Sequence, residues 1–274
     1  MKFAQRLARA WAAGNTLLCV GLDPDPARLP KHLAAVGNPI FEFGRAIVDA
    51  TADLVCAFKP QIAYYAAARA ETELEMTIAH IRRHHPGIPV ILDAKRGDIG
   101  STAVMYAREA FERYQADAVT VNPYLGFDAL VPFLNCQDKG VIVLCRTSNP
   151  GARDVQDLES NGRKLYQLIA EKAARDWNAN GNVLLVVGAT YPEELAEIRA
   201  IVGDMPILVP GVGTQGGDVA AVIANGATAD GTGLIISTSR AVLYAGSGED
   251  YAEAARAAAQ KLRDEINSCR KAGR

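Results

Sequence analysis

The feature that most constrains the fold of this chain is a regular alternation of short apolar runs with segments of helical periodicity. The eight apolar runs, each bounded by glycine, proline or polar residues, begin at Thr16, Ala57, Ile88, Ala116, Gly140, Asn182, Met205 and Gly233. The main helical patterns cover residues 71–83, 102–114, 162–177, 192–202, 218–225 and 250–270. Repeated strand–helix units indicate parallel strands joined by right-handed crossovers. Eight evenly spaced units in about 250 residues favour an α/β fold with a single (β/α)8 TIM barrel domain over residues 1–274, rather than an open doubly wound sheet.

The N-terminal stretch MKFAQRLARAWAAG has the periodicity of an amphipathic helix, so we expect an extra helix before the first strand. Arg6 and Arg9 interrupt any apolar region of signal-peptide type. No uncharged apolar run approaches the roughly 20 residues that span a bilayer. These patterns predict a cytoplasmic protein that has no membrane partner.

Charge and cysteine content narrow the expected partners further. The formal net charge is −2, and a chain without a basic excess is not expected to bind nucleic acid. The five cysteines are odd in number, show no C-x-x-C spacing and lie mostly among apolar neighbours. Such cysteines are typical of buried reduced thiols in the cytosol rather than of a disulfide framework.

Polar residues gather at one end of the expected strands. Those at or just beyond a C-terminal strand end are Asp23, Lys59, Asp93, Lys95, Asn122, Ser148 and Gln215. In a barrel this rim carries the active site. A long polar loop, residues 148–162, follows the fifth strand, and loops of that length in compact domains are usually functional.

The stretch VILDAKRGDIGSTA, residues 90–103, concentrates opposed charges at the end of the third run. Side chains two residues apart on a strand share a face, so Asp93 and Lys95 are expected to be adjacent. Asp98 could return to the same site or reach a neighbouring subunit, with Thr102 following on the next helix. A lysine buried between two carboxylates would stay protonated and could donate a proton. The alternative is an ion pair that only satisfies local charge.

The glycine-rich segment GVGTQG, residues 211–216, matches the letters of a dinucleotide-binding fingerprint. It follows the seventh expected strand rather than the first. TIM barrels form phosphate sites from the loops after strands seven and eight. This position favours a monophosphate site.

Other polar candidates each have two interpretations. The run HIRRHH, residues 80–85, contains an i, i+4 histidine pair that could bind a metal, but we find no acidic partner and expect a solvated helix face. Arg146 and Asn149 flank Ser148 and could contact a substrate or order the loop. Asn122 could contact a ligand or fix its own loop. Cys145 is expected in the core, because no histidine is predicted near it.

Six segments resemble, in order, the longer bacterial-type branch of the orotidine 5'-phosphate decarboxylase family. They are VGLDPDP (20–26), FKPQ (58–61), LDAKRGDIGST (92–102), TSNPGA (147–152), PGVGTQGGD (210–218) and STSRAVLYA (237–245). The resemblance implies decarboxylation of orotidine 5'-phosphate to UMP, the last step of de novo pyrimidine biosynthesis. It also implies a homodimer with shared active sites and a reaction that needs no metal or organic cofactor.

The resemblance implies catalytic roles for Lys59, Asp93, Lys95 and Asp98, and a substrate-binding role for Asp23. It implies that Asp23 and Lys59 contact the ribose and join a charge network. The family's D-x-K-x-x-D array maps onto Asp93, Lys95 and Asp98. Carbon dioxide loss leaves an electron pair in the plane of the ring, which a nearby cation can stabilise. Lys95 would stabilise this carbanion at C6 and protonate it, with Asp93 beside the departing carboxylate.

The remaining assignments concern substrate binding. Asp98 would enter the partner's site together with Thr102. The loop residue Ser148 would hydrogen-bond the pyrimidine ring. Gln215 and Arg240 would hold the phosphate, with the backbone from Gly211 to Gly213.

Two other functions compete with this one. A related barrel that acts on sugar phosphates would share the D-x-K-x-x-D array but use Mg²⁺ and an open-chain substrate, and FKPQ and TSNPGA argue against it. A nucleotide sensor without catalysis is the second alternative. The presence of Asp93, Lys95 and Asp98 together argues against that alternative.

Overall fold

Eight parallel strands form the centre of the molecule. The computed structural model describes residues 1–212 and 217–272. The strands are β1 (Leu18–Leu22), β2 (Ala57–Pro60), β3 (Ile91–Arg96), β4 (Ala118–Val121), β5 (Gly140–Arg146), β8 (Val183–Val187), β9 (Ile207–Pro210) and β10 (Leu234–Thr238). Each coincides with one of the eight apolar runs, and only β3 extends beyond its run, by the single residue Arg96. Nearly every strand residue is buried, as expected for parallel strands that are covered on both faces.

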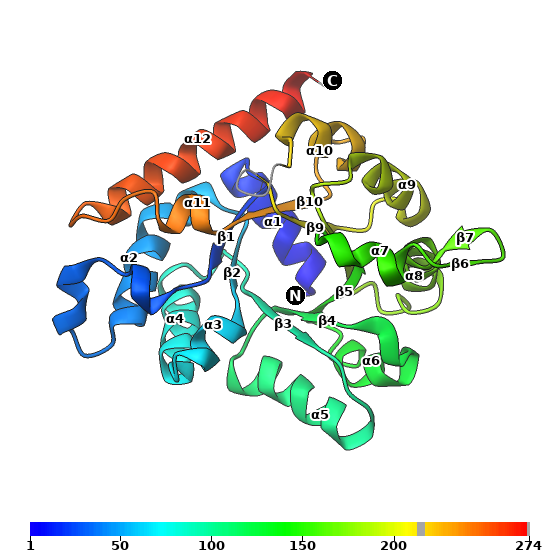
Figure 1. The fold of residues 1–274 in the computed structure, drawn as a ribbon, viewed down its shortest axis with the longest axis horizontal. Coiled ribbons are helices and arrows are strands. Elements are labelled where there is room, and N and C mark those ends of the chain that lie inside the picture. The colour runs from blue at the N-terminus through cyan, green and yellow to red at the C-terminus, as the bar shows by residue number, and fades with distance from the viewer. Residues whose placement is uncertain (213–216, 273–274) are drawn as a thin grey trace.

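The strands close into a ring. Their order is β2-β1-β10-β9-β8-β5-β4-β3, and isolated parallel bridges from Phe58 to Val90 and from Gln61 to Asp93 join the two ends. Helices surround this ring on the outside (Figure 1). The prediction of a (β/α)8 TIM barrel is therefore confirmed.

Ten helices in the described part of the chain cover the ring. They are α2 (Pro39–Thr51), α3 (Ile62–Ala67), α4 (Glu71–His84), α5 (Gly100–Arg108), α6 (Phe127–Leu134), α8 (Leu165–Arg175), α9 (Pro192–Val202), α10 (Val219–Gly226), α11 (Arg240–Leu243) and α12 (Tyr251–Ala272). Six of them, α4, α5, α8, α9, α10 and α12, overlap the predicted periodic segments. The expected helix over residues 102–114 differs in its second half. There α5 gives way to a π-helical turn, Glu109–Arg113, in which the Tyr114 N–H donates to the Glu109 carbonyl at 3.0 Å.

The predicted N-terminal helix, α1 (Phe3–Gly14), closes one end of the barrel and crosses the middle of the ring in Figure 1. It lies at the N-terminal ends of the strands. Arg6 forms an ion pair with Asp117, which precedes β4, at 3.2 Å. The Phe3 ring packs so closely on Gly140, the first residue of β5, that a Cβ there would lie 2.6 Å from it. The opposite end of the barrel is left for a site.

The long loop after β5 is more ordered than the sequence indicates. It contains a 3-10 turn (Pro150–Ala152), α7 (Arg153–Gln156) and the antiparallel hairpin of β6 (Glu159–Ser160) and β7 (Arg163–Lys164). The hairpin projects from the ring in Figure 1. Other 3-10 turns cover Pro26–Arg28, Lys31–Ala35, Ala52–Leu54 and Pro123–Leu125.

The cysteines are free thiols, as predicted. Cys19, Cys56 and Cys145 are buried, whereas Cys136 and Cys269 are partly buried. Burial raises the pKa of Cys19 to about 12, so this thiol stays protonated and serves as a core side chain. Across the described residues, no helix combines the length and apolar character that a membrane span requires.

Candidate active site

The Asp93 carboxylate is the centre of a charge network at the C-terminal rim of the barrel. Its Oδ2 accepts a hydrogen bond from Lys59 Nζ at 2.9 Å, and its Oδ1 accepts one from Lys95 Nζ at 2.7 Å. The Thr120 hydroxyl also donates to Oδ1, at 2.8 Å. Strands β2, β3 and β4 thus each contribute to one carboxylate. The expected adjacency of Asp93 and Lys95 is confirmed.

The backbone at Lys95 is not that of a regular strand. Its φ is +47°, a left-handed conformation that non-glycine residues seldom adopt. The pairing of β3 with β4 shifts register between Leu92 and Arg96. Thr120 Oγ1 accepts hydrogen bonds from the N–H groups of Ala94 and Lys95, at 3.0 and 2.9 Å, and supports this turn. Sequence reasoning missed Thr120, although a hydroxyl in an apolar strand was a usable signal.

The buried lysine of the site is Lys59 rather than Lys95. The Lys59 side chain is 5% exposed, whereas that of Lys95 is 46% exposed. Burial opposes protonation of Lys59, but the charges of Asp93 and Asp23 outweigh it and hold the pKa of Lys59 above its usual value. Lys95 is exposed at the left-handed turn near the end of β3, where the burial of the strand residues ceases.

Asp93 remains ionised in this network. Burial alone would raise the pKa of Asp93, but the ammonium groups of Lys59 and Lys95 outweigh burial and hold it well below its usual range. Two cations therefore share one carboxylate at the rim. Lys95 is the more accessible of the two cations.

A cavity of about 340 Å³ opens beside this network. Its described lining residues are Asp23, Lys59, Gln61, Tyr64, Asp93, Pro210, Gly211, Val212, Ser237, Thr238, Ser239 and Arg240. Among the described residues, the buried atoms Asp23 Oδ1 and Thr238 Oγ1 have no hydrogen-bond partner. Buried polar atoms without partners are rare, so these two are available to a ligand.

The expected phosphate-binding residues are described only in part. Arg240 is the exposed first residue of α11 and lines the cavity, as does Gly211, whose φ of +98° favours glycine. Gln215 and Gly213 lie outside the described residues. The cavity thus brings together Arg240 and the Gly211 backbone, as the sequence predicts for a site formed by the last two strand ends.

Four predicted site residues are not among the described cavity-lining residues: Lys95, which is joined to the cavity through its hydrogen bond to Asp93, and Asp98, Thr102 and Ser148. Asp98 is half-buried and accepts a hydrogen bond from the Ile99 N–H at 2.8 Å. Thr102 is exposed on α5. Ser148 is partly buried after β5, close to Gly188, where a Cβ would lie 2.8 Å from the Ser148 Cβ.

The contacts of Arg146 and Asn122 decide between the two interpretations of each residue. Arg146 is fully buried, donates two hydrogen bonds to the Glu194 carboxylate and lies 3.0 Å from the Asp157 carboxylate. It therefore orders the loop after β5. The Asn122 side chain accepts from the Tyr124 N–H at 3.0 Å and fixes its own loop. Cys145 is buried in the core, as predicted.

The interpretation of the histidine run is wrong in one respect. No acidic partner is apparent in the sequence near residues 80–85, but the structure supplies Asp49 from α2. His80 and His85 are partly buried rather than fully solvated. A partner 31 residues upstream leaves no local sequence signal.

Comparisons with known proteins agree with this geometry. Residues 16–258 match the family described as Orotidine 5'-phosphate decarboxylase / HUMPS family. A protein of Ralstonia nicotianae named orotidine 5'-phosphate decarboxylase is 65% identical over 270 residues, which cover 98% of this chain and 100% of that protein. One of Azoarcus sp. with the same name is 63% identical over equal shares. A solved structure, the OMP decarboxylase of Leishmania donovani, matches with a TM-score of 0.86 and 40% identity over 99% of both chains. The chain belongs to the orotidine 5'-phosphate decarboxylase / HUMPS family.

Proposed function

We propose that this protein decarboxylates orotidine 5'-phosphate to UMP and is thus a carboxy-lyase of pyrimidine biosynthesis that acts without a cofactor. The observation that carries the proposal is the Asp93 carboxylate held between the ammonium groups of Lys59 and Lys95 at the barrel mouth. The names of relatives that are 60–65% identical over nearly the whole chain support the same substrate.

The reaction requires a cation near C6, in the plane of the pyrimidine ring. The bond between C6 and the carboxylate breaks, carbon dioxide leaves, and its bonding electrons remain on C6. No carbonyl of the ring can delocalise this pair, so electrostatic stabilisation is required. The Lys95 ammonium supplies it and then transfers a proton to C6. Because Lys95 is half exposed, the resulting neutral amine can recover a proton from water.

Asp93 has two roles in this proposal. It holds Lys95 in place through the 2.7 Å hydrogen bond, and it presents negative charge where the substrate carboxylate must sit. Lys59 balances Asp93 from the buried side, at 2.9 Å. A carboxylate with only one partner would be costly at this depth, whereas two partners keep it ionised.

Contacts distant from the reacting carbon supply binding energy. We assign the phosphate to Arg240 and to the backbone near Gly211, with Gln215 and Gly213 added by resemblance. The orphaned Asp23 Oδ1 suits a ribose hydroxyl, which can donate to it. Ser148 is assigned to the pyrimidine ring.

We further propose a homodimer in which Asp98 and Thr102 enter the partner's site. Large apolar side chains are exposed beside them: Ile99, Met105, Tyr124, Leu125 and Phe127. Helices α5 and α6, which follow β3 and β4, pack against each other and carry part of this set. Exposed apolar clusters of this kind mark interaction surfaces. A second copy of the chain is the occupant that would also complete the site.

Two broader expectations are retained as proposals. Residues 1–274 are taken to form a single barrel domain, which the hydrophobic core that extends from Phe3 in α1 to Ile266 in α12 supports. A cytoplasmic location is supported by the five free cysteines.

The test is turnover by the purified full chain. Loss of orotidylate absorbance should be observed in EDTA, with UMP as the product. The family description also includes HUMPS members, so a sugar phosphate with Mg²⁺ is the matched alternative assay. Activity only in that second assay, or turnover of neither substrate, would refute the proposal.

A further inference from the structure

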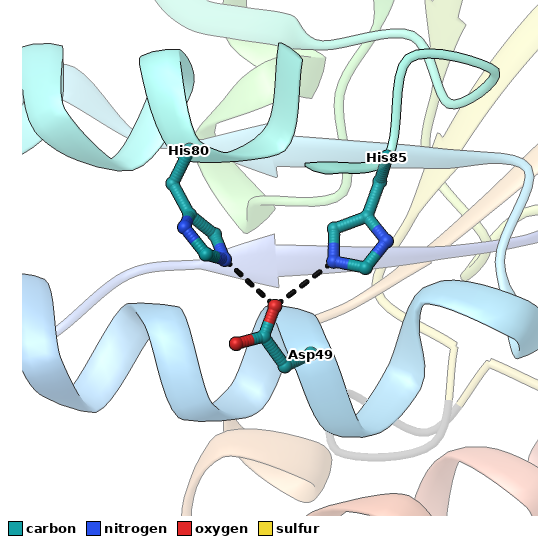
Figure 2. A group of neighbouring side chains, drawn as sticks. All are labelled: Asp49, His80 and His85. Carbon is teal, nitrogen blue, oxygen red and sulfur yellow. Dashed lines mark hydrogen bonds and ion pairs between the residues drawn. The ribbon is translucent and has the colours of Figure 1, made fainter. Parts of the chain in front are cut away.

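Asp49, His80 and His85 form a compact cluster on the outside of the barrel (Figure 2). His80 Nε2 lies 2.7 Å and His85 Nε2 lies 2.9 Å from the same oxygen, Asp49 Oδ1. The three ligand-type atoms all lie within 4.8 Å of one another. Figure 2 shows the two rings pointing toward the carboxylate from opposite sides. The decarboxylation proposal uses none of these residues.

The donor set is that of a zinc-class metal ion. Two imidazole nitrogens and one carboxylate oxygen bind Zn²⁺ in many proteins, with water in the fourth position. A tetrahedral ion with ligands at about 2.0–2.1 Å holds its donor atoms about 3.3 Å apart. The N to O separations of 2.7 and 2.9 Å would need to widen by about half an ångström, an adjustment that the partly exposed side chains of Asp49 and His85 can make. Asp49 and His85 are partly exposed, so an ion and its water can enter.

The rings are already oriented. The His80 ring lies near the rings of His84 and Phe41, with centroid distances of 4.3 and 6.2 Å. His84 is not the second ligand, although its i, i+4 spacing suggests it, because its Nδ1 lies 3.1 Å from the His80 carbonyl oxygen. His85, just past the end of α4, takes that position instead. Little rotamer freedom remains for His80 to lose on binding.

The local charges also suit a cation. The Asp49 carboxylate supplies a negatively charged ligand atom to the cluster. Asp49 lies in the last turn of α2, and His80 and His85 lie at the end of α4, where helix dipoles present negative charge. Arg45 approaches Asp49 to 3.7 Å, but its guanidinium is paired with the Glu42 carboxylate.

We propose that Asp49, His80 and His85 form a binding site for a divalent transition-metal ion of the zinc class, which ties α2 to α4. Both helices end at the N-terminal side of the barrel, because β2 and β3 follow them. A hydrogen bond from the Phe41 N–H to Glu73 already joins the other ends of the same helices. The ion would stabilise the fold and leave the chemistry at the opposite rim unchanged.

The experiment measures thermal unfolding of the full chain, freed of metal, with and without Zn²⁺. At 100 times the dissociation constant, one site specific to the folded state should raise Tm by roughly 5 °C. His85→Gln and Asp49→Asn should each lose this shift, whereas His32→Gln, an exposed histidine outside the cluster, should keep it. Co²⁺ provides a second readout through its visible absorption on coordination by the imidazoles.

The controls separate this site from other metal ligands and from catalysis. The Tm of each variant without metal shows whether it folds, and orotidylate turnover should not change with occupancy of the site. An absent Tm shift in the unsubstituted protein would overturn the proposal. So would an equal shift in His85→Gln, because the ion would then bind elsewhere. Neither result bears on the decarboxylation proposal.

Discussion

The backbone conformation of one residue, Lys95, shows why the geometry of the site cannot be predicted from the strand pattern alone. Its left-handed backbone is held by two hydrogen bonds to Thr120 Oγ1, and the same hydroxyl donates to Asp93. One threonine thus fixes both the turn and the carboxylate. Strained backbone positions that persist in folded proteins often belong to functional sites. Lys95 fits that pattern, because its ammonium is the accessible cation of the network.

The first prediction concerns the pH dependence of stability. The pKa of Asp93 is lowered in the folded chain, so its ion pairs stabilise the fold above the unfolded value, near pH 4. That contribution is lost as the pH falls toward the lower folded value. Asp93→Asn removes the negative charge that pairs with the buried Lys59. It should therefore reduce the free energy of unfolding by about 3 kcal/mol at neutral pH.

Urea unfolding of both proteins as a function of pH checks this expectation. The difference in unfolding free energy should stay constant between about pH 5 and 7 and shrink below about pH 4. Asp138→Asn, at an exposed position, serves as the matched control. A difference that persists unchanged into strong acid would show that charge is not its cause.

The second prediction concerns Arg240, the exposed cavity residue assigned to the phosphate. Arg240→Ala removes a charge-assisted hydrogen-bond donor and should weaken UMP binding by roughly 10- to 100-fold. Uridine lacks the phosphate, so its affinity should change little. Calorimetric titration with both ligands makes the comparison. Equal losses for UMP and uridine would remove Arg240 from the phosphate site.

At the scale of elements, two strand ends approach so closely that only glycine fits between them. Gly188 follows β8, and a Cβ there would lie 2.8 Å from the Ser148 Cβ and 2.9 Å from the Ser148 nitrogen. Because backbone atoms cannot yield as a flexible side chain can, one of the two loops must move. The position of Ser148 therefore depends on a glycine from a different strand.

This contact yields the third prediction. Gly188→Ala should lower kcat/KM by about 10-fold or more, because a displacement near 1 Å of a positioning group has effects of this size. Gly37→Ala is the control, since a Cβ at that glycine meets nothing within 4 Å. Steady-state kinetics with orotidylate measure both variants. An unchanged kcat/KM for Gly188→Ala would mean that Ser148 does not orient the substrate.

The elements themselves were largely predictable, and the contacts between them were not. Buried parallel strands appear as continuous apolar runs, and α9 coincides with its predicted range because its period and its first proline mark it. The charged strand ends of β2 and β3 were also apparent. The burial of Lys59, the role of Thr120 and the pairing of Asp49 with two histidines depend on neighbours far along the chain. The hairpin of β6 and β7 was missed because its strands have two residues each.

At the level of the whole molecule, the barrel places the proposed metal cluster and the charge network at opposite ends. Its N-terminal end is closed by α1 and carries the cluster of Asp49, His80 and His85, while the opposite rim carries the charge network. Asp98 and Thr102 lie on the second rim but outside the described cavity lining. A dimer formed through the apolar surface around α5 would place Asp98 and Thr102 in the partner's active site.

The fourth prediction tests that assembly. Asp98→Ala and Lys59→Ala should each be nearly inactive alone. If sites are shared, a mixed dimer contains one site with both defects and one site with neither, so mixing should restore up to about a quarter of the unsubstituted activity by random exchange. Activity is assayed after exchange of subunits has been verified with tagged chains. Verified heterodimers without recovered activity would contradict a shared site.

The most direct test of the central claim is the kcat of Lys95→Ala with orotidylate in EDTA, compared with Lys172→Ala on the exposed face of α8. The loss of the cation and proton donor should lower kcat by about 10³-fold, with UMP affinity little changed and the Lys172 variant unaffected. A Lys95→Ala protein that keeps kcat within a few-fold of the unsubstituted enzyme would contradict the role proposed for Lys95.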